Sequence, residues 1–469
     1  MKIILIVPDG VAVRNFLYSN FLDELQKKGF EIHVLYQIPE YAIKEVNEVT
    51  NAIKEYHRIP YFTEPALART LREVGVYARL LHNKKVLHNE TIMCFWNNKK
   101  KGVKRKVLAK VSETVGFFLS KSYSSILFLE NYYVKIMAKT KIYNEVGKII
   151  KAINPDVVLN LHQRSITSSP IINYCNANNI KTATMIFSWD NVPKARLISR
   201  YKYYFTWSEL MKNELKITYN EIKDNQIIVT GSPQFECYFD EKIKMTKDDF
   251  FKEYNLSHHK KTICFSSNDT SSPHEVNYFQ DICEELDKLE EHQKPQIVFR
   301  RNPVDKSNRF KDVLSKFKHL ITEIEPDWKT ENEGDVHFNA VFPKLNDNRL
   351  LVNTVMFCDA VVNLGSTMAH DFAVLDKPCL YLNYNPVENS LFPVEEVYQF
   401  QHFRSMKGLD AVVWINNKSE ISDKIILALN QPNEVAKDRK KWMERIIQHP
   451  LSQCSENIVG KLSKICTSV

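Results

Sequence analysis

The residues with the clearest chemical potential form a Gly-Ser-Thr turn, between a buried apolar run and a helical pattern that begins near Met368. The first turn of a helix has backbone N–H groups without internal partners and a partial positive charge, so such a turn can hold a phosphate without a metal ion. Gly365 lets the chain approach a ligand closely, and Ser366 and Thr367 add hydroxyl donors. The same residues could instead be an ordinary helix start with a Ser or Thr cap.

Polar residues also follow two other apolar runs in the second half of the chain. Ser266, Ser267 and Asn268 come after one run, and Arg300 and Arg301 come after the next. Ligands of doubly wound sheets bind beyond the carboxyl ends of the strands, and guanidinium groups pair phosphate oxygens in a forked geometry. We therefore expect these residues to bind a diphosphate, although Arg301 could be a surface charge and Arg300 could pair with an acid.

Asp371 lies one helical turn beyond Thr367. Its carboxylate could accept a hydrogen bond from a sugar or ribose hydroxyl, or it could stabilise the start of its own helix. We include it in the predicted donor-binding set.

The first half of the chain contains candidates for proton transfer. Asp9 follows the first apolar run, and Asp190 stands beside Trp189 after a later one. A short acid next to a tryptophan in a pocket is a plausible general base, because burial raises the pKa of a carboxyl group toward the working range. Asp190 could equally cap a helix. The remaining candidates on this side would contact an acceptor: Arg14, His162, Trp189 and Asn191.

Metal-dependent and acyl-enzyme chemistry receive no support from the sequence. The chain contains no H-E-x-x-H, no D-x-D and no Ser/His/Asp order of the known hydrolases. Its nine cysteines are scattered and never form a C-x-x-C pair, which favours reduced thiols in a core over zinc or disulfides. We expect no metal and no cofactor.

Alternating strand and helix patterns must position these residues. KIILIV at 2–7 reads as a buried parallel strand, a helix is expected over 15–28, and EIHVLY at 31–36 reads as a second strand. Helical patterns dominate 41–151 before the alternation resumes. The later strand candidates are 156–161, 182–187, 203–207 and 226–230, followed by 261–266, 296–300, 360–364, 378–382 and 411–415.

Two doubly wound Rossmann-like halves facing a central cleft are the natural α/β reading of this order. We expect an N-terminal acceptor-binding domain over 1–220, with a helical basic insertion at about 41–150. A C-terminal donor-binding domain would cover 221–433. Helices at 434–469 would pack back onto the first domain.

A chain of 469 residues with 44% apolar content has enough material for two cores. It lacks the ~20 uninterrupted apolar residues of a membrane span, so we expect a cytoplasmic protein. Residues 84–121 are rich in lysine and aromatic side chains, within a net charge of +8. This segment predicts a peripheral contact with an anionic membrane, with a solvated helix face as the alternative. No nucleic-acid module is recognisable, so nucleic acid is not expected as a partner.

Three short motifs resemble those of known enzymes. VTGSPQFE at 229–236 resembles the domain-hinge segment of bacterial GT-B glycosyltransferases and of the related non-hydrolysing nucleotide-sugar 2-epimerases. LGSTM at 364–368, followed by DKP at 376–378, resembles their donor-phosphate loop and the strand entry after it. FSWDN at 187–191 resembles a segment of surface-polysaccharide glycosyltransferases. The epimerases usually carry a Gly-Asn-Ser-Ser-type loop, so the Gly-Ser-Thr turn favours a transferase.

The resemblance implies a metal-independent glycosyltransferase of GT-B architecture. It would move a sugar from a nucleotide-diphosphate donor to a surface polysaccharide or a lipid-linked glycan. Gly10 alone represents the glycine-rich N-terminal loop of many such enzymes, which leaves the acceptor contacts open. The rival functions are a nucleotide-sugar 2-epimerase, a CDP-polyol phosphotransferase of teichoic-acid type and a non-catalytic scaffold.

Overall fold

The computed structural model describes residues 1–96, 102–330 and 341–468. The chain forms two compact units, which are described separately. Unit 1 consists of Met1–Gln234, Phe400–His402 and Ile446–Val469, and unit 2 consists of Phe235–Gln399 and Phe403–Arg445. The first unit therefore extends beyond residue 220, and the chain returns to it at Ile446 rather than at residue 434.

Unit 1 contains a seven-stranded parallel sheet in the order β3-β2-β1-β4-β5-β6-β7. Five of the six residues of β1 are fully buried, because helices cover both faces of a central parallel strand. The strands are β1 (Lys2–Val7), β2 (Glu31–Tyr36), β3 (Ile53–Arg58), β4 (Val157–Asn160), β5 (Lys181–Met185), β6 (Tyr203–Thr206) and β7 (Ile227–Val229).

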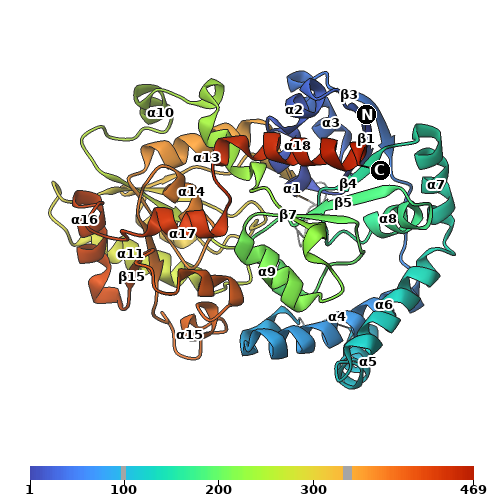
Figure 1. Cartoon of the computed structure of the whole chain (residues 1–469). Helices are drawn as coiled ribbons and strands as arrows, with labels where there is room; N and C mark the ends of the chain where they lie inside the picture. The colour runs from blue at the N-terminus through green and yellow to red at the C-terminus, as the bar shows by residue number, and fades with distance from the viewer. Residues whose placement is uncertain (97–101, 331–340, 469) are drawn as a thin grey trace. The chain divides into compact units, whose positions relative to one another are not determined.

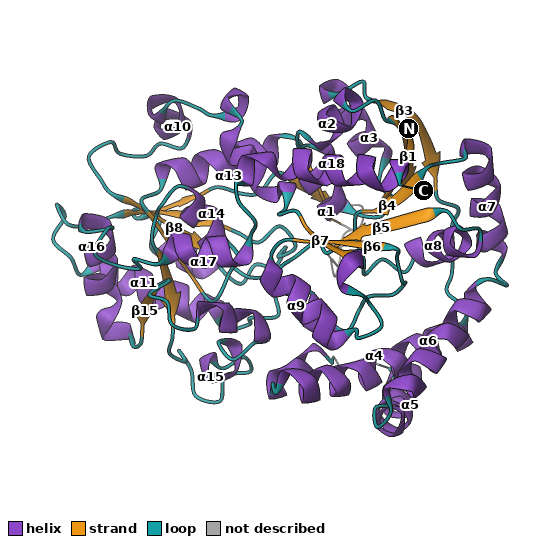
Figure 2. Cartoon of the chain, in the orientation of Figure 1, coloured by secondary structure: helices purple, strands orange, loops and turns teal. Residues whose placement is uncertain are grey.

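The helices of unit 1 pack around this sheet or form a separate helical insertion (Figures 1 and 2). They are α1 (Gly10–Ala12), α2 (Phe21–Lys27), α3 (Glu40–Val49), α4 (Ala66–Leu87), α5 (Val103–Leu119), α6 (Tyr123–Met137), α7 (Lys141–Ile153), α8 (Ser168–Ala177), α9 (Glu209–Thr218) and α18 (Cys454–Thr467). Short helical turns complete the unit, and the two that matter below are η1 (Val13–Leu17) and η3 (Val192–Lys194).

Two predictions for unit 1 are wrong. The single helix expected over 15–28 is divided into the π-helical turn η1 and helix α2. Strand β3 was not predicted, and it lies inside the stretch in which helical patterns were expected to dominate. Its sequence IKEYHR carries charged side chains, as is usual for the edge of a sheet, so it lacks the apolar run by which the other strands were recognised.

The helical insertion is formed by α4, α5 and α6, which pack against one another (Figure 1). Helices α4 and α5 approach closely at Gly116. A Cβ atom there would lie 2.9 Å from Cδ1 of Tyr77 and 3.0 Å from the carbonyl oxygen of Val74, so no larger residue fits without movement of α4.

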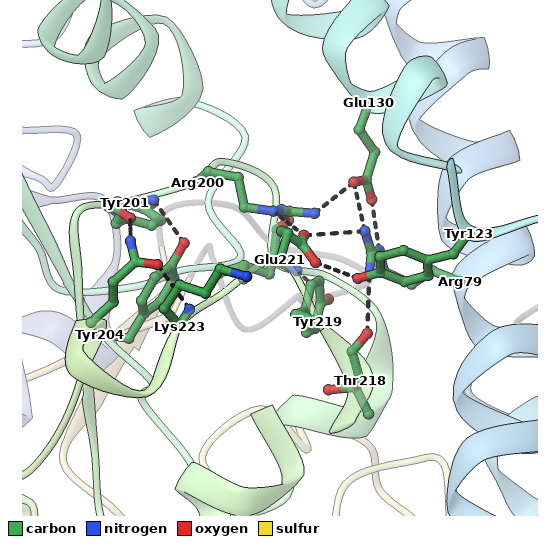
Figure 3. Close-up of polar contacts among 12 residues, drawn as sticks. Arg79, Tyr123, Glu130, Arg200, Tyr201, Tyr204, Thr218, Tyr219, Glu221 and Lys223 are labelled. Carbon is green, nitrogen blue, oxygen red and sulfur yellow. Dashed lines mark hydrogen bonds and ion pairs between the residues drawn. The ribbon is translucent and has the colours of Figure 1, made fainter. Parts of the chain in front are cut away.

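A buried ionic network joins the insertion to the rest of unit 1 (Figure 3). Arg79 of α4 is 1% exposed, and its guanidinium makes two parallel bonds of 2.7 Å to Glu130 of α6. Arg200, from the segment before β6, also pairs with Glu130 at 2.6 Å and pairs with Glu221 at 2.7 Å. The Arg79 guanidinium stacks 4.2 Å above the ring of Tyr219. The network thus links the insertion to segments on both sides of α9.

Unit 2 contains a six-stranded parallel sheet in the order β10-β9-β8-β13-β14-β15 and a small antiparallel pair, β11–β12. The strands of the sheet are β8 (Thr262–Ser266), β9 (Gln296–Arg300), β10 (Ile321–Glu323), β13 (Ala360–Asn363), β14 (Cys379–Leu382) and β15 (Val413–Ile415), and the pair is β11 (Trp328–Thr330) with β12 (Val341–Pro343). Side chains from β8, β9 and β13 join helical residues in one apolar core.

The helices of unit 2 are α10 (Lys247–Glu253), α11 (Glu275–Asp287), α12 (Lys311–Lys316), α13 (Asn346–Phe357), α14 (Met368–Val374), α15 (Val394–Val397), α16 (Ile421–Asn430) and α17 (Arg439–Ile446). The two parallel sheets confirm the predicted pair of doubly wound Rossmann-like halves. Strands β10 (ITE), β11 (WKT) and β12 (VFP) were not predicted, and the first two contain polar residues rather than an unbroken apolar run.

Candidate functional site

Three polar strand ends of unit 2 lie at one edge of its sheet. Strands β9, β8 and β13 are neighbours, so the segments after Arg300, Ser266 and Asn363 leave the sheet side by side. Hydrogen bonds tie these segments together: the Asn268 side chain donates to the carbonyl of Leu364 at 2.9 Å. The backbone N–H after Arg301 similarly donates to the Ser267 hydroxyl at 3.0 Å. The structure thus brings together the residues predicted to bind a diphosphate.

Arg300 and Arg301 have different surroundings. Arg300 is 6% exposed, and its Nη2 atom pairs with Asp347 at 2.8 Å. Its Nη1 atom is buried and bonds no group of the described residues, so this atom could donate to a ligand. Arg301 bonds the carbonyl of Ser307 at 2.7 Å and Glu323 at 3.1 Å. Both terminal nitrogens of Arg301 are thus used within unit 2, whereas its Nε atom is buried and bonds no group of the described residues.

The Gly-Ser-Thr turn differs from the predicted helix start. Helix α14 has only seven residues, and the N–H of Ser366 already donates to the Asn363 side chain at 2.9 Å. The Met368 N–H bonds the hydroxyl of Ser366 at 3.4 Å. The N–H groups of Ser366 and Met368 are therefore already hydrogen-bonded, and the prediction that unpaired amides of this turn form an anion site is wrong for these two groups. Thr367 lies in the same turn, at the residue before α14.

Packing explains why a glycine occupies this turn. Gly365 has φ +66°, and a Cβ atom there would lie 2.9 Å from the Cζ atom of Phe403. Both a left-handed backbone and the nearby ring exclude larger residues. Asp371, on the same short helix, is buried and accepts a hydrogen bond of 2.8 Å from the hydroxyl of Tyr238.

Sequence reasoning missed Arg309, which organises the loop after β8. Its guanidinium bonds the carbonyls of Ser272 at 2.5 Å and Asn268 at 2.9 Å, and it pairs with Glu275 at 3.1 Å. The Glu275 carboxylate in turn accepts from the backbone N–H of Asn268 at 2.8 Å. Because Arg309 lies in a loop without an adjoining apolar run, its sequence context did not reveal this contact.

Unit 1 contains a buried aspartate–histidine pair. Asp9 follows β1 and His162 follows β4, and these strands are neighbours in the sheet. The Asp9 side chain caps α1 through hydrogen bonds from the N–H groups of Val11 and Ala12, and its Oδ2 atom contacts Nδ1 of His162. The ring of Phe187 lies edge-on to the imidazole, 4.1 Å away between centroids.

The hydrogen bond between Asp9 and His162 is oriented as in a general base. Burial alone would raise the pKa of Asp9, but His162 and the two capping amides lower it below its usual value. The ionised carboxylate accepts a hydrogen bond from Nδ1–H of His162, which leaves Nε2 with a lone pair. Nε2 is buried and bonds no group of the described residues. The sequence placed both residues near the site, but it assigned His162 to acceptor binding.

The prediction that burial raises the pKa of Asp190 is wrong. Burial acts in that direction, but Lys194 and His402, with a hydrogen bond from Ser188, hold the pKa of Asp190 well below its usual range. Burial lowers the pKa of His402 to about 4, so this ring is neutral at pH 7 and Lys194 is the counterion. Lys194 follows Asp190 at i+4, and the ion pair fixes the turn before η3.

The two residues beside Asp190 are also buried. Trp189 is 6% exposed and packs 4.6 Å from the ring of His402. Asn191 accepts a hydrogen bond of 3.1 Å from Arg164.

Arg14, Arg164 and Arg196 of unit 1 are among the arginines that form no ion pair within the described part of the chain. Burial lowers the pKa of Arg164, and the charge of Arg196 lowers it further. The segment that contains Arg196 lies against the end of β4, since Ile198 N–H donates to the carbonyl of Gln163 at 3.4 Å. Neither cation forms an ion pair, although the charges of Asp190 and Asp9 act on Arg164 and that of Glu73 acts on Arg196. Two such cations can bind an anionic group.

Solved structures with this fold include enzymes that act on nucleotide sugars. The chain resembles the UDP-GlcNAc 2-epimerase from Neisseria meningitidis bound to UDP-GlcNAc, with 15% identity, coverage of 99% of this chain and 100% of that one, and a TM-score of 0.55. The corresponding enzyme from Methanocaldococcus jannaschii has 15% identity, coverage of 99% and 100%, and a TM-score of 0.53. A glycosyltransferase from Rickettsia africae has 12% identity, coverage of 100% and 99%, and a TM-score of 0.55.

No protein-family model and no curated protein matches the chain. The structural likenesses, at these low identities, establish the fold. The chain has the GT-B fold that these nucleotide-sugar 2-epimerases and this glycosyltransferase share.

Proposed function

We propose that the protein is a glycosyltransferase that moves a sugar from a nucleotide-diphosphate donor to an acceptor hydroxyl. The observation that carries this proposal is the Asp9–His162 pair, whose Nε2 atom is free to accept a proton. The acceptor hydroxyl would give its proton to Nε2 while its oxygen attacks the anomeric carbon. The bond between that carbon and the diphosphate oxygen breaks, and the ionised Asp9 stabilises the resulting imidazolium.

Unit 2 would supply the groups that bind the leaving nucleoside diphosphate. Charge builds up on the diphosphate as the glycosidic bond breaks, and a preorganised cation or N–H donor aimed at it lowers the barrier. Arg300 is the best candidate to bind the diphosphate, because its Nη1 atom bonds no group of the described residues. Ser267 and Asn268 lie on the neighbouring loop. The other predicted donor contacts, including Gly365 and Asp371, remain part of this proposal.

Arg14, Arg164 and Arg196, which form no ion pair within the described residues, suggest that the acceptor is anionic. Arg164 and Arg196 lie near the end of β4, which also carries His162. A diphosphate-linked lipid or a phosphorylated glycan would neutralise them. This supports a lipid-linked acceptor in the synthesis of a surface polysaccharide.

A screen of nucleotides is the first experiment. At a hundredfold excess over Kd, the correct nucleoside diphosphate should raise Tm by about 5–10 °C, because it binds only the folded state. UDP, GDP, CDP and TDP are compared with the corresponding nucleosides by thermal shift. If none of the four changes Tm, the scaffold alternative replaces the enzyme.

A nucleotide-sugar 2-epimerase is the second candidate, because two of the solved structures described above are UDP-GlcNAc 2-epimerases. An epimerase converts its substrate without an acceptor, whereas the proposed transferase needs one. Incubation with UDP-GlcNAc alone, followed by NMR of the sugar, separates the two. A stabilising effect of CDP together with a phosphodiester product would instead identify a polyol phosphotransferase.

We further propose that α5 contacts an anionic membrane. A stripe of exposed apolar side chains runs along it at about every fourth position, with exposed fractions of 40–78%: Val103, Val107, Val111, Val115 and Phe118. Exposed cations flank this stripe: Lys104, Arg105, Lys106, Lys110 and Lys121. Lys99, Lys100 and Lys101 of the predicted basic segment lie outside the described residues. Within the described residues, every helix is too short or too polar to cross a bilayer.

The membrane contact predicts selective binding to anionic vesicles. Each lysine near such a surface contributes about 1 kcal/mol, so the double variant Lys106→Glu/Lys110→Glu should lose at least about tenfold in partition coefficient. Vesicle co-sedimentation with phosphatidylglycerol, and with phosphatidylcholine as the neutral comparison, measures this. Leu427→Asp, at an exposed apolar position of α16, is the matched control and should bind as the unaltered protein does. Equal binding to both lipids would rule out the proposed contact.

A further inference from the structure

Two histidines and a glutamate meet at the edge of the unit 1 sheet. His33 lies on β2, and Glu55 and His57 lie on the adjoining edge strand β3. The strand register pairs His33 with Glu55, and Glu55 and His57 are two residues apart, so all three side chains project from the same face. They belong to a different part of the sheet from Asp9, which follows the carboxyl end of β1.

The separations of the three ligand atoms suit a metal ion. The Glu55 carboxylate lies 3.6 Å from Nδ1 of His33 and 3.3 Å from Nε2 of His57. All three ligand atoms lie within 4.8 Å of one another. A tetrahedral ion with bonds of about 2.0–2.2 Å places its ligands about 3.3–3.6 Å apart, so small side-chain rotations complete the geometry.

The two imidazole nitrogens have no competing partner. Nδ1 of His33 and Nε2 of His57 are buried and bond no group of the described residues. His33 is 4% exposed, so water does not readily satisfy Nδ1. A buried nitrogen without a hydrogen bond is costly unless a ligand binds it. The rings stack at 5.8 Å between centroids, which directs both toward the same region.

A second carboxylate orients His33 in the way that metal-bound histidines require. Glu31, two residues earlier on β2, lies 3.0 Å from Nε2 of His33. The Glu31 carboxylate accepts a hydrogen bond from Nε2–H of His33 and also pairs with the Lys54 ammonium at 2.8 Å. This fixes the proton on Nε2 and leaves the Nδ1 lone pair free.

We propose that His33, Glu55 and His57 bind a divalent transition-metal ion, with zinc the best match to two imidazoles and one carboxylate. Water would occupy a fourth position. The ion would join β3 to β2 at a point where apolar packing is weak, since β3 has partly buried Ile53 and Tyr56 but no fully buried residue. It would thus stabilise the edge of the sheet, independently of the proposed glycosyl transfer.

Cobalt(II) is the probe for this site, because its visible absorption reports the ligand type. The full-length protein carrying Cys94→Ser, which removes the exposed thiol, is titrated with Co²⁺ and then with competing Zn²⁺. We expect one equivalent to bind, with imidazole and carboxylate ligation and no thiolate charge-transfer band, and Zn²⁺ to raise Tm. A thiolate band, or no binding at millimolar Co²⁺, would overturn the proposal.

Substitutions assign the ion to these residues. His57→Asn should weaken Co²⁺ binding by at least about a hundredfold, and Glu31→Gln by about 10–100-fold through loss of the orienting hydrogen bond. If His57→Asn does not fold, Glu55→Gln replaces it, because that side chain is 57% exposed. His319→Asn is the matched control, since His319 pairs with a single carboxylate, Asp287, at 2.9 Å. Undiminished binding in the folded site variants would refute the assignment.

Discussion

Replacing Asp9 by Asn is expected to lower kcat by about 10²–10⁴-fold while the fold is retained. The asparagine amide can donate to Nδ1 of His162, which places the imidazole proton on Nε2 and removes the acceptor lone pair. Asp9 would act on the reaction only through its contact with His162, so it is a positioning residue. Single-turnover transfer from the nucleotide sugar found in the screen measures the loss.

A second variant separates this role from a merely structural one. Asp190→Asn is the comparison, because Asp190 pairs with Lys194 rather than with His162. We expect that variant to retain kcat within about tenfold and to lose stability instead. Equal losses of kcat in both variants would remove the proposed base.

Replacing Arg79 by Met should lower the free energy of unfolding of unit 1 by about 2–4 kcal/mol. The variant leaves Glu130 and Glu221 without one of their cations in a largely buried setting (Figure 3), and Arg200 compensates only in part. Denaturant unfolding gives the change in stability. Hydrogen exchange of α4 and α6 should accelerate more than exchange of the central strand β1.

Arg69→Met supplies the matched control for Arg79. It lies on the same helix, its side chain is exposed, and it forms no ion pair within the described residues. Its stability should change by less than about 0.5 kcal/mol. If the two variants were equally stable, the ionic network would not hold the insertion in place.

The sequence predicted the strands that have unbroken apolar runs. It did not predict the strands that contain charged or polar residues. Strand β1 is almost entirely apolar and was recognised, whereas β3 has charged residues and was not among the predicted strands. Hydrophobic periodicity reports which faces are buried, so it cannot identify a half-exposed edge strand. Strand β10, with the sequence ITE, likewise lacks the apolar run by which β7 and β15 were recognised.

The sequence predicted which residues lie at the candidate site better than it predicted which of them would transfer a proton. Strand ends located Asp9, His162, Ser267 and Arg300 correctly with respect to the sheets, because parallel strands present their carboxyl ends at one edge. Which side chain carries the proton depends on contacts between loops far apart in sequence. Asp190 illustrates this, since His402, more than 200 positions away, is one of the groups that set its pKa.

The return of the chain to unit 1 has a consequence for biosynthesis. Helix α18 packs against α2 and β4 (Figure 1). Its Ile458, Leu462 and Ile465 side chains are buried. During translation, the first 234 residues emerge long before this helix, so the nascent unit keeps an apolar surface uncovered until residues 454–467 have been synthesised. Chaperone engagement of the nascent chain should therefore persist until the last turns of α18 leave the ribosome.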